Sequence, residues 1–130
     1  MKSNLLQLIT LSAALGICAT ANADTSINEV FTCQLKEGKT MDDVRAANSK
    51  WVKFMNANVA GGNIGSSIAT TVVGNATSGY FLYVDTFANL ESWSTAKSAT
   101  EGNDEGEAID AELGEVADCS GNRLYSVEES

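Results

Sequence analysis

The sequence predicts an α+β domain: a four-stranded antiparallel sheet with helices on one face. Segments with the two-residue alternation of strands are interspersed with segments that have the 3.6-residue periodicity of helices. Along the chain these segments follow the order β-α-β-β-α-α-β. They fall within residues 24–130, which have the size of one domain, since domains commonly run about 100 to 150 residues.

The first strand and helix are predicted at residues 27–57. Residues 27–35 are rich in Val, Phe, Thr and Ile, and the turn-forming residues 36–39 follow them. Thr40 suits a helix N-cap, and Asp42 and Asp43 favour the first helical turn. At about 100° per residue, the apolar side chains of residues 41–57 fall on one broad face. We expect that face to pack on the sheet.

A hairpin is predicted next. Residues 64–73 alternate small polar and β-branched side chains, and residues 74–79 form a turn before the strand at 80–87. In that strand Tyr80, Leu82 and Val84 point to one face, and Phe81, Tyr83 and Phe87 point to the other. Both faces are therefore largely apolar. The helices of this chain can cover one of them, and the other requires a different cover.

The last elements complete the order. Residues 88–99 predict a helix capped by Thr86 or Asn89, and residues 104–117 predict a third helix with an apolar stripe. Residues 122–128 predict the final strand. This order is in effect the split βαβ arrangement of ferredoxin-like folds, in which the first and last strands are antiparallel neighbours.

The N-terminal residues have the features of a secretory leader. Lys2 precedes the apolar run 5–14, and small residues stand three positions and one position before Asp24. We expect a signal peptide at residues 1–23, cleaved after Ala23, and a mature protein that is periplasmic or secreted. A membrane anchor needs about 20 apolar residues. Here polar residues interrupt the run, and bulky Ile17 before Cys18 disfavours lipidation.

Two cysteines remain after the leader, Cys33 and Cys119. An even number in an oxidising compartment predicts a disulfide, and the C-x-x-C spacing of a redox-active pair is absent. In the ferredoxin-like topology the end of the first strand lies beside the start of the last. The disulfide and the topology, inferred separately, therefore support each other.

Composition excludes several classes of function. The formal charge is −9, and loss of Lys2 with the leader would make it −10, which disfavours nucleic acid and anionic membranes as partners. The chain has no histidine, so it lacks catalytic triads, histidine-bound zinc and histidine-ligated haem. The acidic residues at 104–110 suit a helix start better than a calcium loop. We therefore predict neither a metal nor a cofactor.

Five residues are candidates for a ligand pocket. They are Asn48, Trp51, Met55, Tyr83 and Trp93. Asn48 falls in the middle of the apolar face of its helix, where an amide needs hydrogen-bond partners. It either orients a ligand or bonds to the sheet edge or a buried water. The two tryptophans either line the pocket or pack in the core. Asp85 is either a general base or a polar residue at a strand end.

Several segments together resemble the dimeric α+β barrel superfamily. They are the strand 30–35, the turn 36–39, the helix from Met41, the strand 80–85 and the helix start Leu90-Glu91-Ser92-Trp93. The resemblance implies a homodimer paired sheet to sheet, with a pocket between the sheet and the first two helices. Members include cofactor-independent monooxygenases acting on aromatic compounds, haem-degrading enzymes, dye-type peroxidases and domains with no known activity. The haem branches use a histidine, which this chain lacks.

These observations lead to two functional hypotheses. The first is a secreted or periplasmic, disulfide-containing domain that dimerises and binds a small apolar ligand or a partner protein without catalysis. The alternative is a cofactor-independent monooxygenase-like enzyme acting on an aromatic small molecule. No complete catalytic constellation of that family can be matched to this chain, which favours the first.

Overall fold

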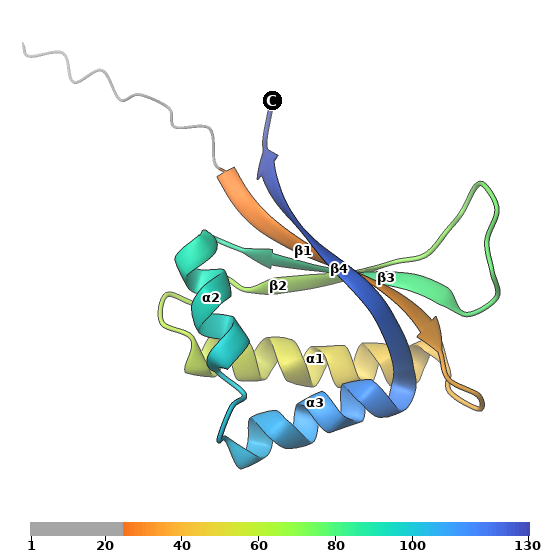
Figure 1. Cartoon of the computed structure of the whole chain (residues 1–130), viewed down its shortest axis with the longest axis horizontal. Coiled ribbons are helices and arrows are strands. Elements are labelled where there is room, and N and C mark those ends of the chain that lie inside the picture. Colours follow the sequence, from red (N-terminus) through yellow and green to blue (C-terminus); the bar gives the residue numbers. More distant parts are fainter. Residues whose placement is uncertain (1–24) are drawn as a thin grey trace, which may run out of the picture.

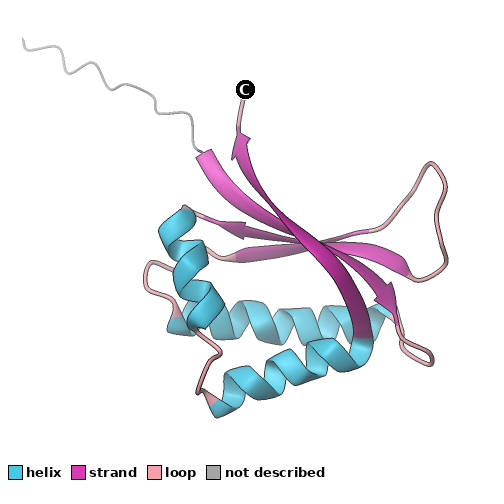
Figure 2. Cartoon of the chain, in the orientation of Figure 1, coloured by secondary structure: helices cyan, strands magenta, loops and turns pink. Residues whose placement is uncertain are grey.

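The computed structural model describes residues 25–130, so the predicted signal peptide and its cleavage site lie outside the described part. The elements are β1 (Thr25–Leu35), α1 (Met41–Asn58), β2 (Gly65–Ala69), β3 (Tyr80–Phe87), α2 (Leu90–Ser98), α3 (Asp104–Val116) and β4 (Ala117–Glu128). The strands form one antiparallel sheet in the order β2-β3-β1-β4, and the helices lie on one of its faces (Figures 1 and 2). This is the ferredoxin-like α+β fold that the sequence predicts.

β1 begins two residues earlier than predicted, and β2 and β4 differ more from their predicted bounds. β2 ends at Ala69, and Val72 and Val73, which were predicted to belong to it, are 92% and 91% exposed in the loop before β3. Strand propensity alone does not make a strand where no neighbour pairs with it. β4 begins at Ala117 rather than residue 122, because Ala117 and Asp118 already pair with the end of β1. The register shifts between Phe31 and Cys33, which is typical of a β-bulge.

The helix α1 is built as its sequence predicts. Thr40 and Asp43 form a reciprocal capping box at its N-terminus. Its buried residues form the stripe that faces the sheet: Val44, Ala47, Asn48, Trp51, Phe54 and Met55. Two apolar clusters fill the space beneath the sheet, one around Phe54 and Phe87 and one around Phe81 and Val116. The core is therefore one layer, between the sheet and the three helices.

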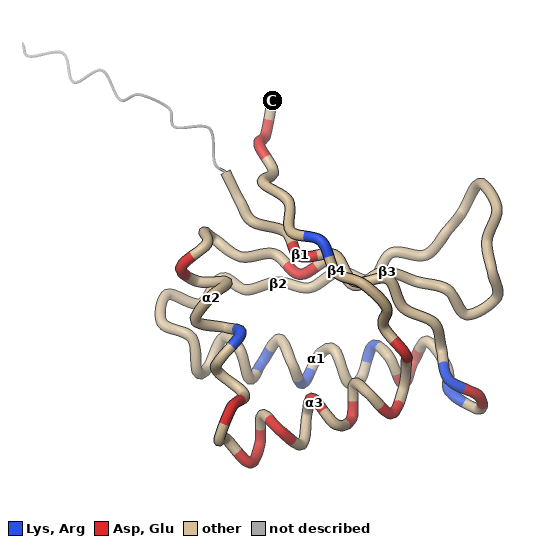
Figure 3. Tube along the Cα trace, viewed as in Figure 1, with Lys and Arg blue, Asp and Glu red and all other residues tan. Residues whose placement is uncertain are grey.

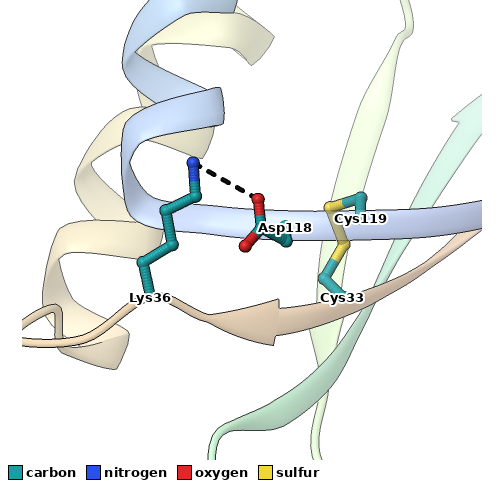
Figure 4. Close-up of a disulfide and its surroundings, with 4 residues drawn as sticks. All are labelled: Cys33, Lys36, Asp118 and Cys119. Atoms are coloured by element: carbon teal, nitrogen blue, oxygen red, sulfur yellow. Dashed lines mark ion pairs between the residues drawn. A yellow bond between two sulfur atoms is a disulfide. The ribbon is translucent and has the colours of Figure 1, made fainter.

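The predicted disulfide is present. Cys33 of β1 and Cys119 of β4 are bonded across adjacent strands, 86 positions apart in the sequence (Figure 4). In the chain-entropy model a crosslink over such a loop stabilises the fold by roughly 4 to 5 kcal/mol. Beside it, Lys36 forms an ion pair with Asp118 at 3.3 Å and donates to the carbonyl oxygen of Gly114. A cation thus reaches the C-terminal turn of α3, which has no basic residue of its own.

The helices α1 and α3 lie side by side and carry opposite charges at their contact. Figure 3 shows acidic residues along α3 and basic residues along α1. Lys50 Nζ lies 2.7 Å from both carboxylate oxygens of Glu112. The N-terminal part of α3 approaches α1 closely at Gly106, where an added Cβ would lie 2.8 Å from the Phe54 ring and 2.8 Å from the Thr100 backbone.

The close contact between α3 and α1 at Gly106 predicts opposite effects for two glycine substitutions in α3. Alanine normally favours a helix over glycine by up to about 1 kcal/mol, and Gly114→Ala should follow that rule because nothing lies within 4 Å of its added Cβ. Gly106→Ala should instead lower the free energy of unfolding by about 1–3 kcal/mol, through overpacking against Phe54 and Thr100. Urea denaturation of both variants tests this. Equal stabilisation of both would contradict the close packing.

Candidate functional site

A cavity of about 320 Å³ lies beneath the sheet and is the candidate site. It opens between the helices and the strands β1, β3 and β4, and its walls come from elements spread over the whole described chain, from β1 to β4. The lining residues are Phe31, Asn48, Trp51, Tyr83, Asp85, Lys97, Asp110, Leu113, Gly114, Ala117 and Cys119. Aromatic and aliphatic walls with a few polar groups are typical of small-molecule sites.

Three of the five predicted pocket residues line this cavity. Asn48 and Trp51 reach it from α1, and Tyr83 reaches it from β3. Asn48 is 8% exposed, and its Oδ1 accepts a hydrogen bond of 3.1 Å from Ser66 Oγ on the edge strand β2. The amide is therefore both bonded to the sheet edge and placed in the cavity wall. Of the two roles weighed from the sequence, the bond to the sheet edge is present, and the orientation of a ligand stays a prediction.

The other two predicted residues, Met55 and Trp93, do not line the cavity. Met55 is 3% exposed and belongs to the apolar cluster around Phe54 and Phe87. It lies one helical turn beyond Trp51, where α1 has passed the cavity. Trp93 packs at the edge of the same cluster, and its indole Nε1 donates to Glu29 Oε2 at 3.0 Å. Met55 instead lines a second cavity, of about 240 Å³, together with Trp51, Lys97 and Asp110.

Asp85 is a buried carboxylate in the wall of the cavity. It is 6% exposed, and its Oδ1 has no hydrogen-bond partner in the described part of the chain. Burial raises the pKa of Asp85 to about 6, since desolvation disfavours the carboxylate. The charge of Glu29 also raises this pKa, whereas the hydrogen bond from Ser66 and the charge of Lys97 lower it. The Ser66 hydroxyl has one proton, which serves either Asn48 or Asp85.

Tyr83 lies two residues before Asp85 on the same face of β3. It is 6% exposed, and its hydroxyl also has no hydrogen-bond partner among residues 25–130. Burial, together with the neighbouring charge of Asp85, raises the pKa of Tyr83 to about 12. The phenol therefore stays protonated at neutral pH. Buried polar groups are normally hydrogen-bonded, so two such groups without a partner from residues 25–130 in one cavity wall call for an explanation, and a bound molecule is one.

A second carboxylate, Glu29, lies in the sheet directly opposite Asp85 in the β1–β3 register. It is 1% exposed, yet both of its oxygens are bonded. Oε2 accepts from Trp93 Nε1 and forms an ion pair with Lys97 Nζ, and Oε1 accepts from Asn122 Nδ2 at 2.7 Å. The Lys97 ammonium also lies 5.1 Å from the centre of the Phe31 ring. Glu29 thus holds Lys97 at the cavity.

Sequence reasoning missed both Glu29 and Lys97, although a signal existed for each. Glu29 falls in the two-residue alternation Ile27, Phe31 and Cys33 that marks the core face of β1, so the pattern placed a carboxylate inside the protein. Lys97 follows Trp93 by four positions and shares its helical face. The partner from β4, Asn122, carried no such signal, because only the strand register brings it to Glu29.

Metal-binding clusters and membrane-spanning helices both bear on the class of site. Within residues 25–130, no three or more Cys, Asp or Glu side chains converge in a way that could hold a metal ion. The acidic residues at the start of α3 include Asp104, Glu105 and Glu107, and they occupy its first turn. No helix in this part of the chain has the length and apolar character needed to cross a bilayer.

The comparisons with known proteins identify the fold. No family model and no curated protein match the chain, but solved structures do. A NIPSNAP family protein of unknown function from Agrobacterium tumefaciens matches with a TM-score of 0.57 and 10% identity, covering 79% of this chain and 88% of that one. A candidate antibiotic biosynthesis monooxygenase from Caulobacter crescentus matches with a TM-score of 0.54 and 13% identity, covering 82% and 92%.

A third similar structure is that of a cofactor-independent oxygenase from Streptomyces nogalater. Its TM-score is 0.53 and its identity 8%, covering 81% of this chain and 95% of that one. At such identities the likeness establishes a shared ferredoxin-like α+β fold, as the resemblance noted in the sequence implied. It does not transfer an activity.

The buried Asp85 predicts a specific dependence of stability on pH. Its pKa of about 6 in the folded protein lies above the ordinary aspartate pKa of 3.8, so the folded state binds more protons than the unfolded state between these pH values. Its contribution to stability is therefore full below about pH 4 and is lost as the pH rises through about 6. In Asp85→Asn this loss disappears. The free energy of unfolding of the variant, taken relative to that of wild type, should therefore rise by roughly 2–3 kcal/mol from about pH 4 to pH 7.5.

Urea denaturation at the two pH values measures this gain. Glu37→Gln, an exposed carboxylate in the β1–α1 turn, serves as the control that changes the net charge equally. A gain of the same size in Glu37→Gln would contradict a specific role of burial at Asp85.

Proposed function

We propose that this protein binds a small, largely apolar ligand in the cavity beneath its sheet and does so without catalysis. The observation that carries the proposal is a pair of buried atoms, Tyr83 Oη and Asp85 Oδ1, that have no hydrogen-bond partner within residues 25–130 and belong to residues lining a cavity of about 320 Å³. Trp51, Phe31 and Leu113 supply apolar walls around them. Ligand pockets commonly start at about 300 Å³ and combine such walls with few polar groups.

Export to an oxidising compartment is part of the same proposal. The leader-like residues 1–23 support it, and so does the Cys33–Cys119 bond, because such bonds persist in secreted and periplasmic proteins. A disulfide near the cavity also suits a binding domain, since Cys119 is one of the lining residues and the bond joins the two strands there. We propose a periplasmic or secreted location on these grounds.

Dimerisation through the outer face of the sheet completes the proposal. The helices leave that face uncovered (Figure 2). Strand register groups apolar side chains on it: Val30, Tyr80, Leu82, Val84, Tyr125 and Val127. Tyr80, Tyr125 and Val127 are 37%, 44% and 38% exposed. Contiguous apolar surface of this kind favours a partner, and a second copy packed sheet to sheet would cover it.

One observation supports the alternative of a monooxygenase-like enzyme. The raised pKa of Asp85, about 6, suits a group that accepts a proton near neutral pH from the hydroxyl of an aromatic substrate. A similar fold also carries a cofactor-independent oxygenase in Streptomyces nogalater. Oxygen uptake with a hydroquinone or another electron-rich phenol separates the two functions. Saturable uptake that is lost in Asp85→Asn would replace the binding proposal with this one.

The binding proposal predicts that the exported protein retains a ligand. Native mass spectrometry should find a dimer of chains that begin at Asp24, lack the two thiol hydrogens and carry a small-molecule adduct. Trp51→Leu should reduce the retained adduct about tenfold, since it removes an aromatic wall of the cavity. Val72→Ala, in the exposed loop before β3, should retain it. A wild-type protein that carries no adduct and binds nothing in a ligand screen would contradict the proposal.

A further inference from the structure

The charges around the cavity do not balance. The ammonium of Lys97 is the one basic group among the lining residues, and it is paired with the buried carboxylate of Glu29. Glu29 has two further donors, Trp93 Nε1 and Asn122 Nδ2, so it is fully satisfied. Asp85 has no cation of its own, and Asp110 adds a second carboxylate from α3. Once Lys97 and Glu29 cancel, the cavity has a net negative charge.

Aromatic rings line the same cavity. Phe31, Trp51 and Tyr83 come from β1, α1 and β3, and each carries the negative ring face that attracts cations. The structure already shows this attraction at one ring, since the Lys97 ammonium lies 5.1 Å from the centre of Phe31. Aromatic faces beside an unpaired carboxylate are the combination by which proteins bind organic ammonium groups.

We propose that the ligand is an organic cation, a protonated amine on a small apolar body, whose ammonium group binds Asp85. This rests on the proposed function, because it names the chemical class of the ligand for the same cavity. The free Oδ1 of Asp85 accepts one ammonium hydrogen, and the protonated Tyr83 hydroxyl has lone pairs that accept another. Trp51 and Leu113 enclose the apolar body.

Other head groups fit this cavity less well. A carboxylate or phosphate would meet Asp85 and Asp110, and the one cation of the lining, Lys97, is already paired with Glu29. A neutral hydroxyl could donate to Asp85 Oδ1, but it would leave the buried charge without a counterion. An ammonium group supplies both the donor and the countercharge.

The test compares three compounds that share a phenyl body and differ in the head group. They are 2-phenylethylamine, 2-phenylethanol and 3-phenylpropanoate. Calorimetric titration of the full protein at about pH 7.5 and low salt should give a dissociation constant for the amine about tenfold or more below that of the alcohol, and the carboxylate should bind most weakly. Asp85→Asn should reduce the preference for the amine to about twofold or less. The equal-charge control Glu37→Gln should keep it.

A second measurement does not depend on any variant. The groups that face Asp85 are Glu29 on β1, Lys97 on α2, Tyr83 on β3, Ser66 on β2 and, across the cavity, Asp110 on α3. With these in place the pKa of Asp85 is about 6, so its ionised fraction rises about tenfold between about pH 5 and pH 7.5. Amine affinity should rise by the same factor while alcohol affinity does not.

The outcomes separate this inference from the proposed function. Three results would each overturn the proposal that the ligand is an organic cation. They are equal binding of amine and alcohol, an amine preference that survives Asp85→Asn, and an amine affinity that is independent of pH. The cavity would still be a ligand site if the alcohol binds. If none of the three compounds binds, the proposal of a cationic ligand is overturned. Whether the protein retains an adduct in native mass spectrometry then tests the proposed function separately.

Discussion

The burial of Glu29 is the constraint on which the candidate site depends. A carboxylate that is 1% exposed is costly by several kcal/mol unless donors and a countercharge surround it. Those groups come from two elements, Trp93 and Lys97 on α2 and Asn122 on β4. Satisfying one carboxylate therefore fixes the orientation of α2 over the sheet and favours the observed register of β4. It also directs Lys97 to the cavity.

The same arrangement leaves Asp85 without a cation of its own among residues 25–130. Glu29 and Asp85 are opposite each other in adjacent strands, and the cavity offers them a single lysine. Because Glu29 has that lysine and two more donors, Asp85 keeps an unbonded oxygen and a raised pKa. The fold is shared with proteins of 8–14% identity, whereas this division of charge depends on individual side chains. A fold shared at such identities does not determine function, and the side chains of the cavity do.

The fold was more predictable than the site, for a physical reason. The periodicity of α1, the cap at Thr40 and the alternation in β3 are local patterns, and together with the Cys33–Cys119 pair they define the topology. The bounds of β2 and β4 depended on which strands find partners, which no local pattern contains. Asn48, Trp51 and Tyr83 were predicted because each lies on an inward face, but the contact between Glu29 and Asn122 required the register.

The central claim is that Asp85 is a buried carboxylate without a cation of its own. The most direct test is a carbon-detected NMR titration of the side-chain carboxyl groups in the oxidised, full-length mature protein, with Asp85 assigned through Asp85→Asn. The structure predicts a midpoint near 6 for Asp85, raised by burial. A midpoint near 4, the ordinary value for an exposed aspartate, would show that water or a cation reaches this carboxylate and would contradict the claim.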